Sequence, residues 1–204
     1  MRGVYDVRTA IADYLAEAMP VKIAQARAQW NLGSMWLPVP LRYDAYDPLT
    51  TNIYPTVGSL VTRSRGFSRI DYNADRNEQY RVQYSTRVFV WVKTPEYIDT
   101  NSLVDQPYDS TMKVRDDIVA VLRSTLLDDP SFGTGVPDGP VLEMDEGSIN
   151  EEYFDAIQQN GQTATWYAGG SIAFDMSSIE SQYREPLGSA DTITTTVSHL
   201  DSTP

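Results

Sequence analysis

Apolar residues recur at helical spacing in two separate stretches of the chain. Residues 4–19 place their apolar side chains on one helical face: Val7, Ile11, Tyr14, Leu15 and Met19. Pro20 suits a kink or the first position of a second helix, so we expect two helical pieces here. A second apolar stripe runs through residues 111–127, after Asp109 or Ser110 as the helix cap. The pattern therefore predicts two amphipathic helical regions.

Residues 80–93 change to a period of two. One parity is apolar: Tyr80, Val82, Tyr84, Val88, Val90 and Val92. The other parity begins with polar residues: Arg81, Gln83, Ser85 and Arg87. This alternation predicts a long antiparallel strand. Because Phe89 and Trp91 interrupt the polar parity, we expect that half to be covered on both faces, by a helix or by a neighbouring subunit.

Weaker signals predict the remaining strands. Residues 53–62 favour a strand that starts near Pro55, and residues 63–69 favour a polar connection after it. Residues 37–48 are rich in Pro, Tyr and Asp and indicate an ordered loop. The segments 141–144, 151–158 and 162–176 favour strands, and the last two flank Asn160-Gly161, which suits a type I′ hairpin turn.

These elements predict one α+β domain over residues 1–180, with a mostly antiparallel sheet flanked by helices on one side. Residues 181–204 are rich in Ser, Thr and Asp and form a polar C-terminal extension that we expect to be mobile or bound to a partner. Within it, the β-branched run 192–197 is suited to joining a sheet edge that a partner offers.

Composition removes several classes of function. The chain of 204 residues has no cysteine and one histidine, His199, which excludes thiol nucleophiles, thiolate metal sites and nearly all histidine chemistry. The net charge is −12, but residues 1–123 carry +1 and residues 124–204 carry −13. Such an acidic region repels phosphate, so specific DNA binding is not expected. It suits a solvated surface or, alternatively, an acidic wall along which passing DNA would slide without sticking. No spanning segment or signal peptide is predicted.

No motif of catalysis or cofactor binding is present. The glycines of residues 133–139 lack the lysine of a phosphate-binding loop, and no nucleophile elbow occurs. Five acidic residues form a cluster in the sequence: Asp145, Glu146, Glu151, Glu152 and Asp155. Their spacing does not match a calcium-binding loop, so we expect a solvated acidic surface. Glu151 and Asp155 could serve as the two carboxylates of a glycosidase, but any chain with this many acidic residues contains such a pair. We expect no catalytic residue, no cofactor and no metal.

Two features point instead to assembly. Arg63, Arg65 and Arg69 are the one basic concentration, and they are suited to pairing with carboxylates of a neighbouring copy or, equally, to an exposed loop without a partner. The chain also has 13 Tyr and 4 Trp, residue types favoured at protein interfaces, although Tyr14, Trp30 and Trp91 suit the core better.

Four features of the sequence form one arrangement. They are the order of elements, the break at residues 15–20, Arg27 and Trp30 in the second helical piece, and residues 53–58 leading into a strand. Together they resemble the tail-terminator proteins of long-tailed bacteriophages over residues 4–180. The resemblance implies a hexameric ring that sits on the last ring of the tail tube, stops tube growth and docks on the head connector or stopper. It implies a virion protein of the tail or neck, assembled in the host cytoplasm.

Under that interpretation, charge makes residues 63–69 and 145–155 the candidate subunit contacts or channel lining. Two alternatives stay open. Another neck component, such as a head-completion or stopper protein, would differ in its partner, and a carboxylate-based hydrolase or carbohydrate-binding protein would act as a monomer.

Overall fold

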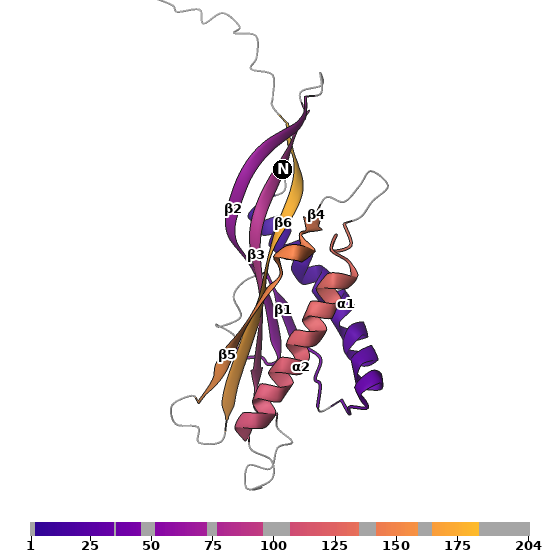
Figure 1. Cartoon of the computed structure of the whole chain (residues 1–204), viewed down its shortest axis with the longest axis vertical. Coiled ribbons are helices and arrows are strands. Elements are labelled where there is room, and N and C mark those ends of the chain that lie inside the picture. Colours follow the sequence, from indigo (N-terminus) through magenta and orange to yellow (C-terminus); the bar gives the residue numbers. More distant parts are fainter. Residues whose placement is uncertain are drawn as a thin grey trace, which may run out of the picture.

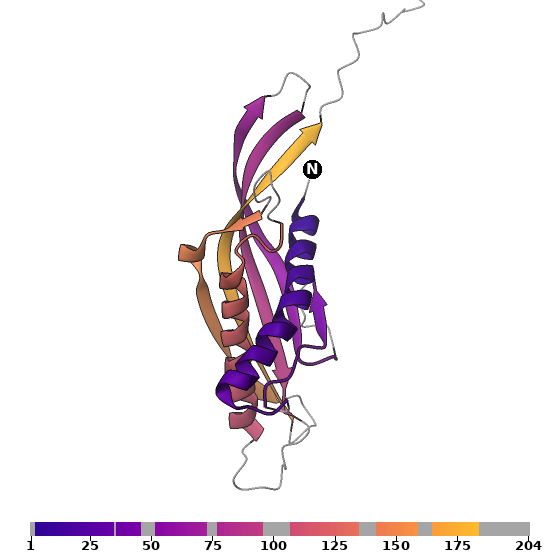
Figure 2. The ribbon, with the colours of Figure 1, turned by 90° about the vertical axis from the view of Figure 1, so that its right-hand side faces the viewer.

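The computed structural model describes residues 3–34, 36–45, 52–72, 77–95, 107–134, 142–158 and 165–183. Two long helices lie on one face of a single curled sheet (Figures 1 and 2). The helices are α1 (Val4–Trp30) and α2 (Pro107–Asp128), and a short 3-10 turn, η2, spans Glu146–Ser148. The strands are β1 (Arg42–Asp44), β2 (Thr56–Tyr72), β3 (Asn77–Lys93), β4 (Leu142–Met144), β5 (Asn150–Gln158) and β6 (Trp166–Tyr183). The predicted α+β class is confirmed.

The sheet has the strand order β1-β2-β3-β6-β4, and β5 pairs with β6 further along the same edge as β4. Among the described strands, only the short pairing of β1 with β2 is parallel. Strand β3 confirms the predicted strand at residues 80–93, with buried residues at every second position from Val82 to Val92. Its central place, between β2 and β6, explains why it carries the clearest period in the sequence.

Helix α1 is continuous through Pro20, so the expectation of two separate pieces is wrong. Proline removes one backbone hydrogen bond and bends a helix without necessarily ending it. Figure 2 shows the change of direction near the middle of α1. Leu15, Met19 and Ile23 are fully buried on either side of the proline, and this packing holds both halves against the rest of the protein.

Helix α2 begins at Pro107, so Asp109 and Ser110 lie in its first turn and the prediction that one of them caps the helix is wrong. Proline suits a first helical position because the backbone N–H that it lacks would have no partner within the helix there. The predicted apolar stripe is confirmed, with Ile118, Leu122 and Leu126 fully buried.

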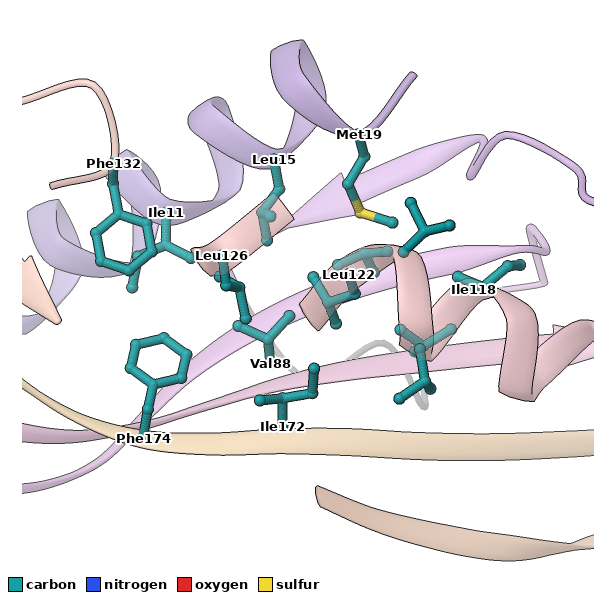
Figure 3. Close-up of a cluster of buried hydrophobic side chains, with 14 of the residues drawn as sticks. Ile11, Leu15, Met19, Val88, Ile118, Leu122, Leu126, Phe132, Ile172 and Phe174 are labelled. Atoms are coloured by element: carbon teal, nitrogen blue, oxygen red, sulfur yellow. The ribbon is translucent and has the colours of Figure 1, made fainter. Parts of the chain in front are cut away.

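The core lies between the two helices and the sheet (Figure 3). Ile11 and Leu15 of α1 and Leu122 of α2 point toward Val88 and Ile172 of the central strands. At one end, the Phe132 ring packs between two others, with its centroid 5.8 Å from that of Tyr14 and 5.9 Å from that of Phe174 of β6.

None of the described helices lies over the opposite face of the sheet (Figure 2). There Trp91 stacks on Phe154 of β5, with ring centroids 5.8 Å apart and planes 25° apart. On this face of the protomer, Trp91 therefore contacts a side chain of the same sheet and not a helix, and the expected cover by a neighbouring subunit stays a prediction. Gly169 lies between the two rings in the strand register, where it pairs with both Trp91 and Phe154.

The C-terminal half of the prediction is largely confirmed. Strands β5 and β6 form the expected antiparallel pair, and β4 is the expected short strand. Strand β6 continues to Tyr183, past the predicted boundary at residue 180. The turn at Asn160-Gly161, the run 192–197 and His199 lie outside the described residues.

Candidate assembly surfaces

The outer parts of β2, β3 and β6 project beyond the helices as a three-stranded arm (Figures 1 and 2). The register defines this arm as residues 63–72 of β2, 77–85 of β3 and 175–183 of β6. β2 and β6 are its two edges, and β3 is its centre. The arm contains the basic residues that the sequence singles out.

Residues 63–69 are part of β2, so the prediction of a polar connection is wrong. Every residue from 62 to 70 is exposed, whereas the paired part of β3 alternates between exposed and buried positions. A strand that is open on both faces needs no alternation of apolar and polar residues, and this is why the sequence does not reveal it. Backbone pairing with β3 is what makes this segment a strand.

Three β-bulges decide which way the arginines face. They insert Thr62, Gly66 and Ile70 as extra residues of β2. Arg63 and Arg65 pair with the outward parity of β3 and lie on the face without helices, whereas Arg69 pairs with Tyr80 on the helix-bearing face. The three predicted arginines therefore do not form one cluster.

A hollow of about 530 Å³ on the arm brings Arg65 together with part of the predicted acidic cluster. It is lined by two cations, Arg65 and Arg81, and by four acids: Glu143, Asp145, Glu146 and Asp175. Asp145 Oδ1 accepts a 3.0 Å hydrogen bond from Gly147 N and so caps the η2 turn. Asp175 accepts a 2.7 Å hydrogen bond from Ser85 Oγ. Within the described ranges, Arg65 and Arg81 form no ion pair closer than 4.0 Å.

The other predicted acids lie on β5, away from the hollow. Glu152 forms a two-point contact with Arg87, with oxygen–nitrogen distances of 2.7 and 3.3 Å. Glu151 accepts a 3.0 Å hydrogen bond from Arg123 of α2. These two acids are thus satisfied inside the protomer, whereas Asp155 is exposed and has no ion pair in the described part of the chain.

Contacts of β5 with α2 fix its position. Arg115 is 5% exposed and donates a 2.7 Å hydrogen bond to the carbonyl oxygen of Phe154. Its guanidinium lies 5.2 Å from the ring centroid of Tyr153. Burial, followed by the hydrogen bond to Glu151, raises the pKa of Tyr153 to about 12, so the phenol stays protonated and donates to Glu151. These contacts indicate a structural role for the acidic side of β5.

The helix-bearing face of the arm contains a buried carboxyl group. Glu180 of β6 is 1% exposed, and one of its oxygens accepts a hydrogen bond from the Tyr84 hydroxyl. Burial and this hydrogen bond raise the pKa of Tyr84. The pair ties β3 to β6 within the arm, in a place where an apolar pair would otherwise be expected.

The described residues contain no group of three or more His, Cys, Asp or Glu side chains placed to hold a metal ion. Neither helix of the described chain is long and apolar enough to cross a membrane. What the arm presents is charge, apolar side chains and strand edges, which are the means of protein association.

Comparison with known proteins adds no assignment: no protein-family model matches the sequence, and no curated protein matches it.

Several residues of these surfaces were not predicted from the sequence. Arg81, Glu143 and Asp175 join the hollow from three different strands. Phe67 and Ile70 of β2 are 65% and 46% exposed. The sequence signal for this surface was the presence of apolar residues next to arginines in residues 63–70. That signal indicates an interface only once the segment is known to be an exposed edge strand.

Proposed function

We propose that the protein is a ring-forming subunit of the tail-terminator type, which closes the end of a phage tail tube and joins it to the head connector. The observation that carries the proposal is the arm, whose edge strand β2 is exposed on both faces over residues 62–70. A strand left open on two faces and one edge costs little in solution only if its side chains are polar, yet Phe67 and Ile70 are apolar. Such an element is completed by a partner.

The arm favours a ring over a two-fold dimer. Its two edges are different strands, β2 and β6, and they lie on opposite sides of the arm in both views (Figures 1 and 2). When one edge contacts the other edge of the next copy, the contact is head-to-tail and it closes into a ring if the rotation permits. A hexamer is the ring size that the family resemblance implies.

Charge supports the same arrangement. Arg63 and Arg65 have no ion pair in the described structure, and the chain has an excess of acids in its second half. Arginines of one copy facing carboxylates of the next would set the direction of assembly. The net charge of −12 would at the same time let DNA pass through the ring without specific binding. The function is thus proposed to be structural, in the neck of the virion, with the tail tube protein and a head connector or stopper as partners.

Native mass spectrometry and electron microscopy of the full chain, with and without purified tail tubes, test this proposal. The expected result is a closed ring, free in solution or formed only at a tube end, together with tubes that stop growing. A monomer that neither assembles nor binds tube ends would overturn it.

Charge reversal supplies a second test. Arg63→Glu combined with Arg65→Glu is expected to prevent ring formation and to leave the far-UV circular dichroism unchanged, because neither arginine has an ion pair to lose within the described protomer. Lys113→Glu is the control, since it reverses an exposed charge on α2, away from the arm. Assembly that survives the double reversal would show that these arginines are not at the subunit contact.

A further inference from the structure

We propose that the C-terminal segment of one copy, residues 184–204, binds along the β2 edge of the neighbouring copy, with residues 192–197 added as a β-strand. The inference rests on the proposed ring and adds to it the element that covers the open edge.

The β2 edge is available for such a strand. β1 pairs with β2 only at Thr56, Val57 and Gly58, and no described strand pairs with that edge beyond Gly58. Backbone groups along an open edge are a template for an added strand. The bulges at Thr62, Gly66 and Ile70 keep each regular stretch short, so the edge fits a short strand better than a long one.

The proposed occupant has the composition of a short strand. All residues from 192 to 197 are β-branched, in the order Thr-Ile-Thr-Thr-Thr-Val. In an extended conformation, Ile193 and Val197 would lie on one side and three threonines on the other. The apolar side matches the exposed Phe67 and Ile70 of β2.

The charges of β2 and of the C-terminal segment are complementary. Strand β2 contains three arginines and one aspartate, whereas residues 184–204 contain one arginine and three acids, Glu185, Asp191 and Asp201. Two of the β2 arginines, Arg63 and Arg65, have no ion pair within the described chain. The acids of an arriving segment would provide one.

The strand order favours a neighbouring copy over the same chain. β6 ends at Tyr183, paired with Asn77, on the edge of the arm opposite to β2. Residues 184–191 span at most about 26–29 Å when extended. Its own β2 lies about 10 Å away at the usual strand spacing, which is within that reach, but the segment would have to pass over β3. In a head-to-tail ring, the β6 edge faces the β2 edge of the next copy, and the segment that follows β6 would lie between the two edges without crossing β3.

Disulfide trapping in the full-length protein tests the contact, because the chain has no cysteine of its own. Thr194→Cys is combined with Ser68→Cys or with Ser64→Cys, which lie on opposite faces of β2. Ser124→Cys, at an exposed position of α2, replaces the β2 cysteine in the control. Rings are first verified by native mass spectrometry under reducing conditions and are then mildly oxidised and run on non-reducing gels.

We expect a ladder of covalent multimers from at least one β2 pair, at roughly tenfold or more above the Ser124 control, because neighbouring thiols share a millimolar effective concentration. Mixing Ser68→Cys copies with Thr194→Cys copies should give dimers only. Two results overturn the inference while the ring stands: a disulfide within one chain, or verified rings with no trapping above the control. A failure to form rings before oxidation would instead reject the proposed function, and the inference with it.

Discussion

The indole ring of Trp91 lies against the α-carbon of Gly169 on the neighbouring strand. A Cβ atom at Gly169 would come within 2.9 Å of three ring atoms of Trp91, the nearest being Cε3 and Cζ3 at 2.8 Å. No side chain fits there unless the indole moves, and the indole also stacks on Phe154 of β5. The pair therefore fixes the local spacing of β3, β6 and β5 on the face without helices.

Gly169→Ala is expected to lower the free energy of unfolding by about 1–3 kcal/mol, the usual cost of overpacking. Chemical denaturation followed by tryptophan fluorescence measures it. Gly3→Ala is the control, because a Cβ atom added at Gly3 would meet nothing within 4 Å. If the clash is the cause, Trp91→Leu combined with Gly169→Ala should cost less than the sum of the two single changes.

Core packing between the helices predicts a large effect at one leucine and a small one at another. Leu122 of α2 is fully buried among residues of α1 and the sheet, whereas Leu127 is 42% exposed. Leu122→Ala is expected to cost about 2–5 kcal/mol through lost burial and a residual cavity. Leu127→Ala should cost far less, and equal losses for the two variants in urea denaturation would contradict the packing described here.

The helices and β3 were predictable because each is amphipathic, with one face buried in the core. The β5–β6 pair was predictable from the turn signal Asn160-Gly161 between the two segments. The outer half of β2 was not, because the hydrophobic pattern reports burial and this segment is exposed on both faces. The bulge at Gly66 is a second feature that the sequence pattern did not predict. Arg65 and Arg69 are four residues apart and would share a face in a regular strand, but the extra residue places them on opposite faces.

The residues that line the hollow show why the sequence could identify candidate residues but not which of them lie together in the structure. Arg65 and Asp145 are far apart in sequence, and the pairing of β2, β3, β6 and β4 brings them to one surface. Nothing in the local sequence encodes that proximity. Glu151 and Glu152, adjacent to each other in sequence, instead face different arginines, because successive residues of a strand point to opposite faces.

The ion pair between Arg87 and Glu152 is expected to contribute little to stability. The two side chains are 30% and 41% exposed, so water and salt screen their attraction. A double-mutant cycle with Arg87→Ala and Glu152→Ala should give a coupling energy of about 0.2–1 kcal/mol that falls as salt is added. A coupling that is several-fold larger and insensitive to salt would show that the pair is shielded from solvent, as it would be inside an assembly.

The loop after α2 predicts a loss of stability in acid. Burial alone would raise the pKa of Asp129, but hydrogen bonds from Ser131 and Gly133 outweigh it and hold the pKa below its ordinary value of 3.8. A carboxyl whose pKa is lowered by folding stabilises the protein above its unfolded pKa, and that contribution is lost as the pH falls through the folded pKa. Asp129→Asn should therefore flatten the decline in melting temperature below about pH 4. If the melting temperature of the variant falls in acid as steeply as that of the unmodified protein, Asp129 does not control the loss of stability.

The exposed apolar residues of the arm separate assembly from folding. Phe67 and Ile70 are 65% and 46% exposed in the protomer, so replacing both with lysine is expected to change its melting temperature by no more than an ordinary surface substitution does, within about 0.5 kcal/mol of stability. Ring formation should be lost, because the added charges cannot be buried against a neighbour without partners. Ile157→Lys is a matched control, since Ile157 is 61% exposed but lies on β5, far from the arm along β6. Light scattering at matched concentrations measures assembly, and rings formed by the Phe67 and Ile70 variant but not by the control would place the subunit contact on β5 instead.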